Sequence, residues 1–142
     1  MTFELDRFVD AQDHVYEGVL DELRHGRKTG HWIWFIFPQI AGLGHSAMSE
    51  RFSIVSLDEA RAYLGHPILG ARIHECVTAV LGTRGRTADE IFGPLDARKL
   101  RSSMTLFHRA APDDPAFPQV LERFFDGSAD AGTNALLARA AR

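Results

Sequence analysis

Helix start and stop signals recur from Ser46 onward and restrict the fold of the chain more strongly than any other feature. A hydroxyl residue stands three positions before a glutamate at Ser56 and Glu59, and again at Thr87 and Glu90, which is the capping-box pattern of a helix N-terminus. Prolines at first helical positions and glycines after the last apolar residue supply further boundaries. Together these signals predict helices over residues 56–64, 67–81, 87–92, 96–111, 114–126 and 133–141.

The first half of the chain shows the same helical periodicity. Apolar residues between Leu5 and Leu23 recur at helical spacing, which predicts one helix, or two if Asp13 caps the second. Periodicity alone leaves residues 31–37 open between a buried strand and a short buried helix. No pair of alternating apolar runs is joined by a hairpin turn. We therefore predict an all-α fold, a single compact domain of about six to eight helices over residues 1–142.

Composition limits the class of protein. The chain has 142 residues, of which 45% are hydrophobic and 25% charged, as in ordinary folded domains. Its formal net charge of −3 argues against a nucleic acid partner bound through bulk positive charge. The longest apolar run, Trp32 to Phe37, is too short to span a membrane, and the N-terminus lacks a signal pattern. The single cysteine, Cys76, lies on an apolar helix stripe, so we expect a cytoplasmic protein with an unreactive core thiol.

An aromatic segment, residues 31–39, contains two tryptophans and two phenylalanines within six positions. Large aromatic side chains usually belong to the core, but they also line pockets in which planar ligands stack. The polar residues at its two ends, His31 and Gln39, together with Trp34, are the candidate ligand-binding residues of this segment.

A second group of polar residues lies on the helix predicted over 96–111, where Asp96 is the expected N-cap. Lys99, Ser102 and Ser103 follow at i, i+3 and i+4, so one helix face is expected to carry an ammonium group and two hydroxyls. This polar face has three possible interpretations: a lysine-activated serine nucleophile, a face that binds an anionic or polyhydroxylated ligand, and plain solvated polar residues.

Two further patterns are weaker. Residues 42–47 fit the Gly-x-Gly-x-x-Ala dinucleotide pattern, but a strand does not run directly into them, so a tight loop is expected, with free N–H groups before a helix capped by Ser46. Seven histidines are present without a metal-ligand spacing. We expect neither a metal site nor a cofactor.

Three segments resemble a known family: HWIWFIFPQ at 31–39, SLDEA at 56–60 with the His-Pro pair at 66–67, and KLRSSMTLF at 99–107. They are similar to the bacterial family catalogued as domain of unknown function 1810, some members of which carry the label "calpastatin". That label does not fit, because calpastatin inhibitory segments are disordered and this composition is globular. The resemblance implies an all-helical domain and no established activity. The helical architecture also resembles, in general character, the NADAR group linked to ADP-ribose N-glycoside hydrolysis.

Two functional hypotheses follow. The first is a binder or hydrolase of a phosphorylated, nucleotide-like small molecule of the ADP-ribose type, which leaves open whether the protein is an enzyme. Its site would combine the two groups above, and hydrolysis would need a carboxylate to activate water or to stabilise an oxocarbenium-like charge. Asp96 is the candidate carboxylate, and His31 is the other candidate catalytic residue. The alternative is a non-catalytic protein–protein interaction module, in which the aromatic residues form the core and a helix face binds a partner.

Overall fold

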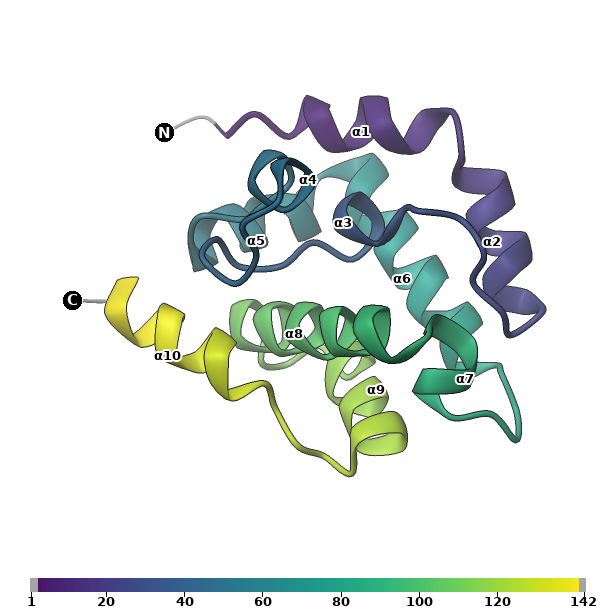
Figure 1. Ribbon diagram of the computed structural model, residues 1–142. Helices are drawn as coiled ribbons and strands as arrows, with labels where there is room; N and C mark the ends of the chain where they lie inside the picture. The colour runs from purple at the N-terminus through teal and green to yellow at the C-terminus, as the bar shows by residue number, and fades with distance from the viewer. Residues whose placement is uncertain (1–2, 141–142) are drawn as a thin grey trace.

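A computed structural model describes residues 3–140, and this part of the chain folds into ten α-helices (Figure 1). In chain order they are α1 (Asp6–Asp13), α2 (Tyr16–Arg24), α3 (Ile33–Ile36), α4 (Ala47–Arg51), α5 (Leu57–Gly65), α6 (Pro67–Leu81), α7 (Ala88–Phe92), α8 (Pro94–Ala110), α9 (Ala116–Phe125) and α10 (Ala131–Ala140). The all-α prediction is confirmed, but there are more helices than the six to eight expected. Residues 1, 2, 141 and 142 of the predicted domain, including the predicted end of the last helix, lie outside the described residues.

The additional helices are short segments at the N-terminal half. The apolar stripe divides into α1 and α2 because the chain leaves helical geometry at Val15, where φ is −128°. Asp13 does not cap α2; its carboxylate instead pairs with Arg72 at 2.9 Å. The ambiguous aromatic segment forms the single-turn helix α3 rather than a strand.

Local capping explains most helix boundaries of the second half. At α7 both bonds of the capping box are present, one from the Glu90 N–H to the Thr87 hydroxyl and one from the Thr87 N–H to the Glu90 carboxylate. At α5 only the first bond forms, from the Glu59 N–H to the Ser56 hydroxyl. The buried Glu59 carboxylate instead accepts the Val55 N–H and pairs with Arg7 at 3.1 Å.

The boundary of α8 differs from the prediction. The helix begins at Pro94 after Gly93, whose φ of 80° suits glycine, so Asp96 lies in the first turn and is not the N-cap. The Asp96 carboxylate is thereby free to reach across to the chain that follows α2, where it pairs with Lys28 at 2.6 Å.

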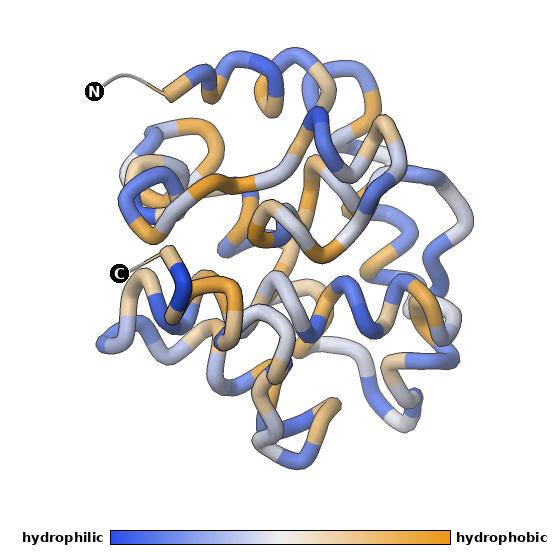
Figure 2. Tube along the Cα trace, turned by 60° about the vertical axis from the view of Figure 1, so that its left-hand side comes forward, coloured by the Kyte–Doolittle hydropathy of each residue, from blue (hydrophilic) through white to orange (hydrophobic). Residues whose placement is uncertain are grey.

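Helix α8 is the central element of the core. It crosses the middle of the view in Figure 1 and packs against α5, α7, α9 and α10. Aromatic side chains of three helices meet around it, with Tyr63 and Phe117 each in contact with Phe107. Hydrophilic and hydrophobic positions are interspersed along the trace (Figure 2), as amphipathic helices around a shared core require.

Two further predictions from the sequence, on Cys76 and on membrane-spanning helices, can be compared with the structure. Cys76 is buried, which confirms its predicted place in the core. Burial raises the pKa of its thiol to about 12, so the thiolate form is disfavoured at neutral pH. Within residues 3–140, none of the helices combines the length and the hydropathy that a membrane-spanning helix needs.

A short parallel contact between Ile40 and Ile54 is the one β-bridge among the described residues. The Ala41 N–H donates to the Ile54 carbonyl at 2.8 Å, and the Ile54 N–H donates to the Gln39 carbonyl at 2.9 Å. These bonds join the two ends of residues 41–53, a segment that contains α4. We call this segment the bridged loop.

Candidate functional site

Two adjoining depressions border the bridged loop, and the larger of them lies between this loop and α8. The larger, of about 310 Å³, is lined by α8 through Leu95, Arg98, Lys99 and Ser102. The smaller, of about 150 Å³, is lined by Trp34, Phe52 and residues 40–42 of the bridged loop and its base. Three residues border both depressions: Gln39, Gly44 and Ser49. We call the two the wide compartment and the small compartment.

The wide compartment carries incompletely neutralised positive charge. The Asp96 carboxylate pairs with Lys28 at 2.6 Å and with Lys99 at 3.5 Å, so two ammonium groups share one carboxylate. The Lys28 side chain is only 5% exposed, whereas that of Lys99 is 30% exposed. Arg98, one position earlier on α8, is exposed and forms no ion pair within the described chain. Lys28 and Lys99 are the only two lysines in the sequence.

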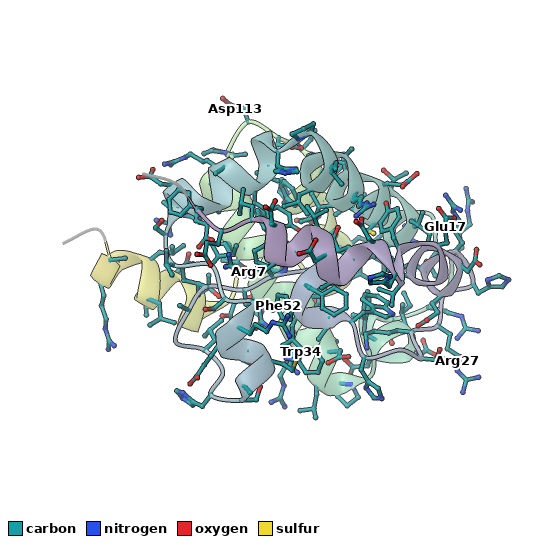
Figure 3. All side chains as sticks on the ribbon, turned by 90° about the horizontal axis from the view of Figure 1, so that it is seen from above. Arg7, Glu17, Arg27, Trp34, Phe52 and Asp113 are labelled. Carbon is teal, nitrogen blue, oxygen red and sulfur yellow. The ribbon has the colours of Figure 1, made fainter. Side chains whose placement is uncertain are left out.

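Trp34 lies at the junction between α8 and the small compartment. The Lys99 ammonium lies over its ring, 4.9 Å from the centroid. Its indole N–H is sealed from solvent and has no acceptor among the described residues. Figure 3 shows Trp34 next to Phe52, the aromatic residue that shares the small compartment with it. An unsatisfied buried donor is rare in folded proteins, and it marks this compartment as unusual.

The three polar residues predicted to share one face of α8 do not all reach the same surface. Lys99 and Ser102 line the wide compartment, and the Ser102 hydroxyl donates to the Arg98 carbonyl at 3.1 Å. Ser103 is fully buried, and its hydroxyl has no partner among the described residues. The expected ammonium-and-hydroxyl face therefore consists of Lys99 and Ser102 at the surface, with Ser103 on the core side.

His31 lies in a separate depression of about 310 Å³, which is also lined by His14, Glu22 and Trp32. The Glu22 carboxylate there accepts the N–H groups of Thr29 and Gly30 and the indole N–H of Trp32. Neither His31 nor Asp96 is among the residues that line the two adjoining compartments. The structure thus brings Gln39, Trp34, Lys99 and Ser102 together and leaves His31 elsewhere.

Several residues of this site carry no signal in the sequence that indicates their place in it. Lys28 follows α2 closely, so its charge is well placed for the helix C-terminus, and nothing local indicates that it reaches Asp96. Arg98 has no local signal that separates it from other exposed arginines. The glycine pattern at 42–47 did indicate a tight loop, and residues of this loop line both compartments.

Comparison with known proteins shows which family the chain belongs to. The family model described as "Protein of unknown function (DUF1810)" matches residues 2–137. The chain belongs to this family. Its structure is also similar to the crystal structure of a conserved hypothetical protein from Mycobacterium tuberculosis, with 53% sequence identity and a TM-score of 0.94 over 96% of this chain and 97% of that one. No curated protein matches.

Family membership confirms the resemblance carried by the three sequence segments and fixes the fold over nearly the whole chain. Neither description names a ligand or a reaction, so the argument for function rests on the geometry of the compartments. Within residues 3–140, no cluster of three or more His, Cys, Asp and Glu side chains could hold a metal ion. The lining of the two compartments offers ammonium, guanidinium, amide and hydroxyl groups, together with the carboxylates of Glu50 and Asp130.

Proposed function

We propose that the protein binds a phosphorylated, nucleotide-like small molecule, whose anionic part lies in the wide compartment against Lys99 and Arg98. The observation that carries this proposal is the sharing of one carboxylate, that of Asp96, between two ammonium groups. Lys28 takes the shorter contact and is buried, so the charge that is left over belongs to Lys99, which borders the compartment.

The charges around the wide compartment support an anionic ligand. Lys28, Lys99 and Arg98 contribute three positive charges, and Asp96 and Asp130 contribute two negative ones. Asp130 is already engaged, because its carboxylate accepts the N–H and the hydroxyl of Thr133 at the start of α10. A phosphate group supplies the missing negative charge together with several acceptor oxygens. The volume of this compartment is also within the range of small-molecule sites.

The same contacts favour binding over hydrolysis. A general base needs a free atom within hydrogen-bond reach of the attacking water. The two Asp96 oxygens each face an ammonium group, Oδ2 that of Lys28 and Oδ1 that of Lys99. His31 lies in another depression. We therefore propose a binding protein, in which Asp96 positions the two lysines.

No observation favours the interaction-module alternative to the same degree. The large exposed apolar residues, Val15, Val55, Ile68 and Leu95, come from four different segments of the chain. Single exposed apolar side chains are normal on folded proteins and do not indicate a docking surface.

Isothermal titration calorimetry at constant ionic strength tests the proposal, with pyrophosphate, ADP and ADP-ribose as the titrants. The Lys99→Gln and Arg98→Gln variants are each expected to weaken binding by about tenfold, the effect of losing one charge-assisted hydrogen bond. Arg84→Gln is the matched control, because Arg84 is an exposed arginine of the loop between α6 and α7. An equal loss in the control, or no heat with any of the three compounds, would contradict the proposal.

A further inference from the structure

The small compartment differs from the wide one in charge. Its lining contains no lysine or arginine, and the one fully charged side chain on it is that of Glu50. The positive charges of Lys99 and Arg98 lie on the wide side. A ligand whose anionic part lies in the wide compartment therefore presents an uncharged part to the small one, since an anion there would meet the Glu50 carboxylate with only the His45 imidazole, and no lysine or arginine, on the lining.

Several hydrogen-bonding groups of the small compartment have no partner within the described chain, whereas those of Ser49 and Ser53 are bonded to neighbouring residues. The Trp34 indole is a donor only, and its N–H has neither a protein acceptor nor access to solvent. Of the backbone groups of residues 40–45, only the Ala41 N–H takes part in a backbone hydrogen bond. The Gln39 side-chain amide, which borders both compartments, has no partner within the described chain and offers both donors and an acceptor.

The walls of the compartment combine these polar groups with apolar surface. Phe52 and Ile40 are buried residues whose side chains form part of the lining. Flat apolar surface next to polar edges suits a planar ring with polar atoms on its rim, whereas a sugar carries hydroxyl groups on all sides. The volume, about 150 Å³, corresponds to about five molecules of liquid water, enough for one six-membered ring with its substituents.

We infer that the small compartment binds an uncharged planar ring that bears a carbonyl oxygen, such as an oxo-substituted nucleobase or a carboxamide ring. Binding turns the partly exposed Trp34 side chain, so that its indole N–H, which is covered in the free protein, donates to the carbonyl. Gln39 then lies at the junction and contacts both parts of the ligand. This inference rests on the proposed function for the placement of the anionic part, and it adds the class of group at the other end.

The two tryptophans of the chain provide a direct test. In a ¹H–¹⁵N spectrum of the labelled protein they give two indole N–H signals, which the Trp32→Phe and Trp34→Phe variants assign. Uridine is the probe, because its base carries two ring carbonyl oxygens. We expect uridine to move the Trp34 signal downfield and to leave the Trp32 signal in place, since the Trp32 N–H already donates to Glu22 at 3.1 Å.

Ribose and pyrophosphate are the comparison compounds that distinguish the possible results of the uridine titration. A Trp34 signal that does not move with uridine, or that moves equally with ribose, would overturn the inference. If pyrophosphate binds in calorimetry while uridine leaves Trp34 unchanged, the proposed function stands and the inference fails. If uridine moves Trp34 but pyrophosphate does not bind, the proposed function fails and the assignment of the small compartment stands.

A second measurement keeps the test independent of the spectrum. The Trp34→Phe variant is expected to bind uridine diphosphate about tenfold more weakly than the wild type and to lose less of its affinity for pyrophosphate, because phenylalanine keeps an aromatic ring for Lys99 but has no N–H. Lys99→Gln weakens the binding of both compounds. Equal affinity of the wild type and Trp34→Phe for uridine diphosphate would contradict the inference, and circular dichroism confirms that the variant is folded.

Discussion

Two regions around α8 each bring a tryptophan and a lysine together: the loop after α2, and the surface that α3 and α8 form beside the bridged loop. In the loop after α2, the Trp32 N–H donates to Glu22, and the buried Lys28 ammonium contacts Asp96, the Gly30 carbonyl and the Trp32 ring. At the bridged loop, the Trp34 N–H has no acceptor, and Lys99 lies 3.5 Å from an Asp96 carboxylate that it shares.

The difference between them separates a structural role from a binding role. Polar groups that satisfy one another fix the position of a loop and have little capacity left for a ligand. Polar groups that stay unsatisfied cost stability in the free protein, and they recover that cost only when a ligand supplies their partners. By this criterion the loop after α2 is a structural element, and the bridged loop with α8 is the binding surface.

Removal of Glu22 is expected to give the largest effect on stability. The Glu22→Ala variant leaves the N–H groups of Thr29 and Gly30 and the indole N–H of Trp32 without their shared acceptor. We expect a loss of about 3 kcal/mol in the free energy of unfolding, measured by urea denaturation. Pyrophosphate affinity of the folded variant should stay unchanged; a large fall in that affinity would contradict the separation of the two roles.

The two lysines give the next largest contrast. Lys28→Met removes the short, buried contact to Asp96 and should lower the free energy of unfolding by about 2 kcal/mol. Lys99→Met removes a longer and more exposed contact, so its effect on stability should stay within about 0.5 kcal/mol. Methionine keeps an apolar stem of similar length in both variants. Equal destabilisation of the two variants in urea would show that Lys99 is also structural.

The two tryptophans are expected to differ in the same direction as the two lysines. Trp32→Phe loses a hydrogen bond to a carboxylate and buried ring volume, and should cost about 1.5 kcal/mol. Trp34→Phe removes a donor that has no partner, so the loss should stay below about 0.5 kcal/mol. Thermal and urea unfolding of the two variants compare them directly, and the reverse order of stability would be inconsistent with an unsatisfied Trp34.

The smallest expected effect is on the pH dependence of stability. Burial by itself raises the pKa of Glu22, but the hydrogen bonds from Gly30, Thr29 and Trp32 outweigh it, so the pKa lies below its ordinary value of 4.5. A carboxyl group whose pKa is lowered by folding stabilises the protein above its unfolded pKa, and this stabilisation is lost as the pH falls through the folded pKa. Urea unfolding of the wild type below pH 4.5 should therefore show a steeper loss than that of Glu22→Gln.

Boundaries set by residues within one helical turn could be predicted from the sequence, whereas contacts between distant segments could not. The capping box of Thr87 and Glu90 is present as predicted, because both of its bonds are local. Asp96 was assigned as a cap wrongly, because Gly93 and Pro94 give an equally local start signal just before it. The prediction could not resolve which of the two adjacent serines, Ser102 or Ser103, faces solvent, since that depends on how α8 is rotated against its neighbours.

The residues of the candidate site also divide into those that the local sequence indicates and those that only the folded chain brings together. Gln39, Trp34, Lys99 and Ser102 were named from the sequence, and the structure places them around adjoining compartments. Lys28 was not named, because its contact with Asp96 joins residues 68 positions apart in the chain. His31 shares the aromatic segment with Trp34, but it comes before the single turn of α3 and lies in another depression.

The bridge between Ile40 and Ile54 has a consequence for how this surface can be altered. Because its two hydrogen bonds close the base of the bridged loop, the thirteen residues from 41 to 53 begin and end at fixed points of the scaffold. The entropic cost of closing a loop rises only slowly with its length. The segment can therefore be exchanged for one of different length or composition while the nine helices outside it are retained, provided that the buried Phe52 side chain is kept, and such exchanges would change which molecules the small compartment selects.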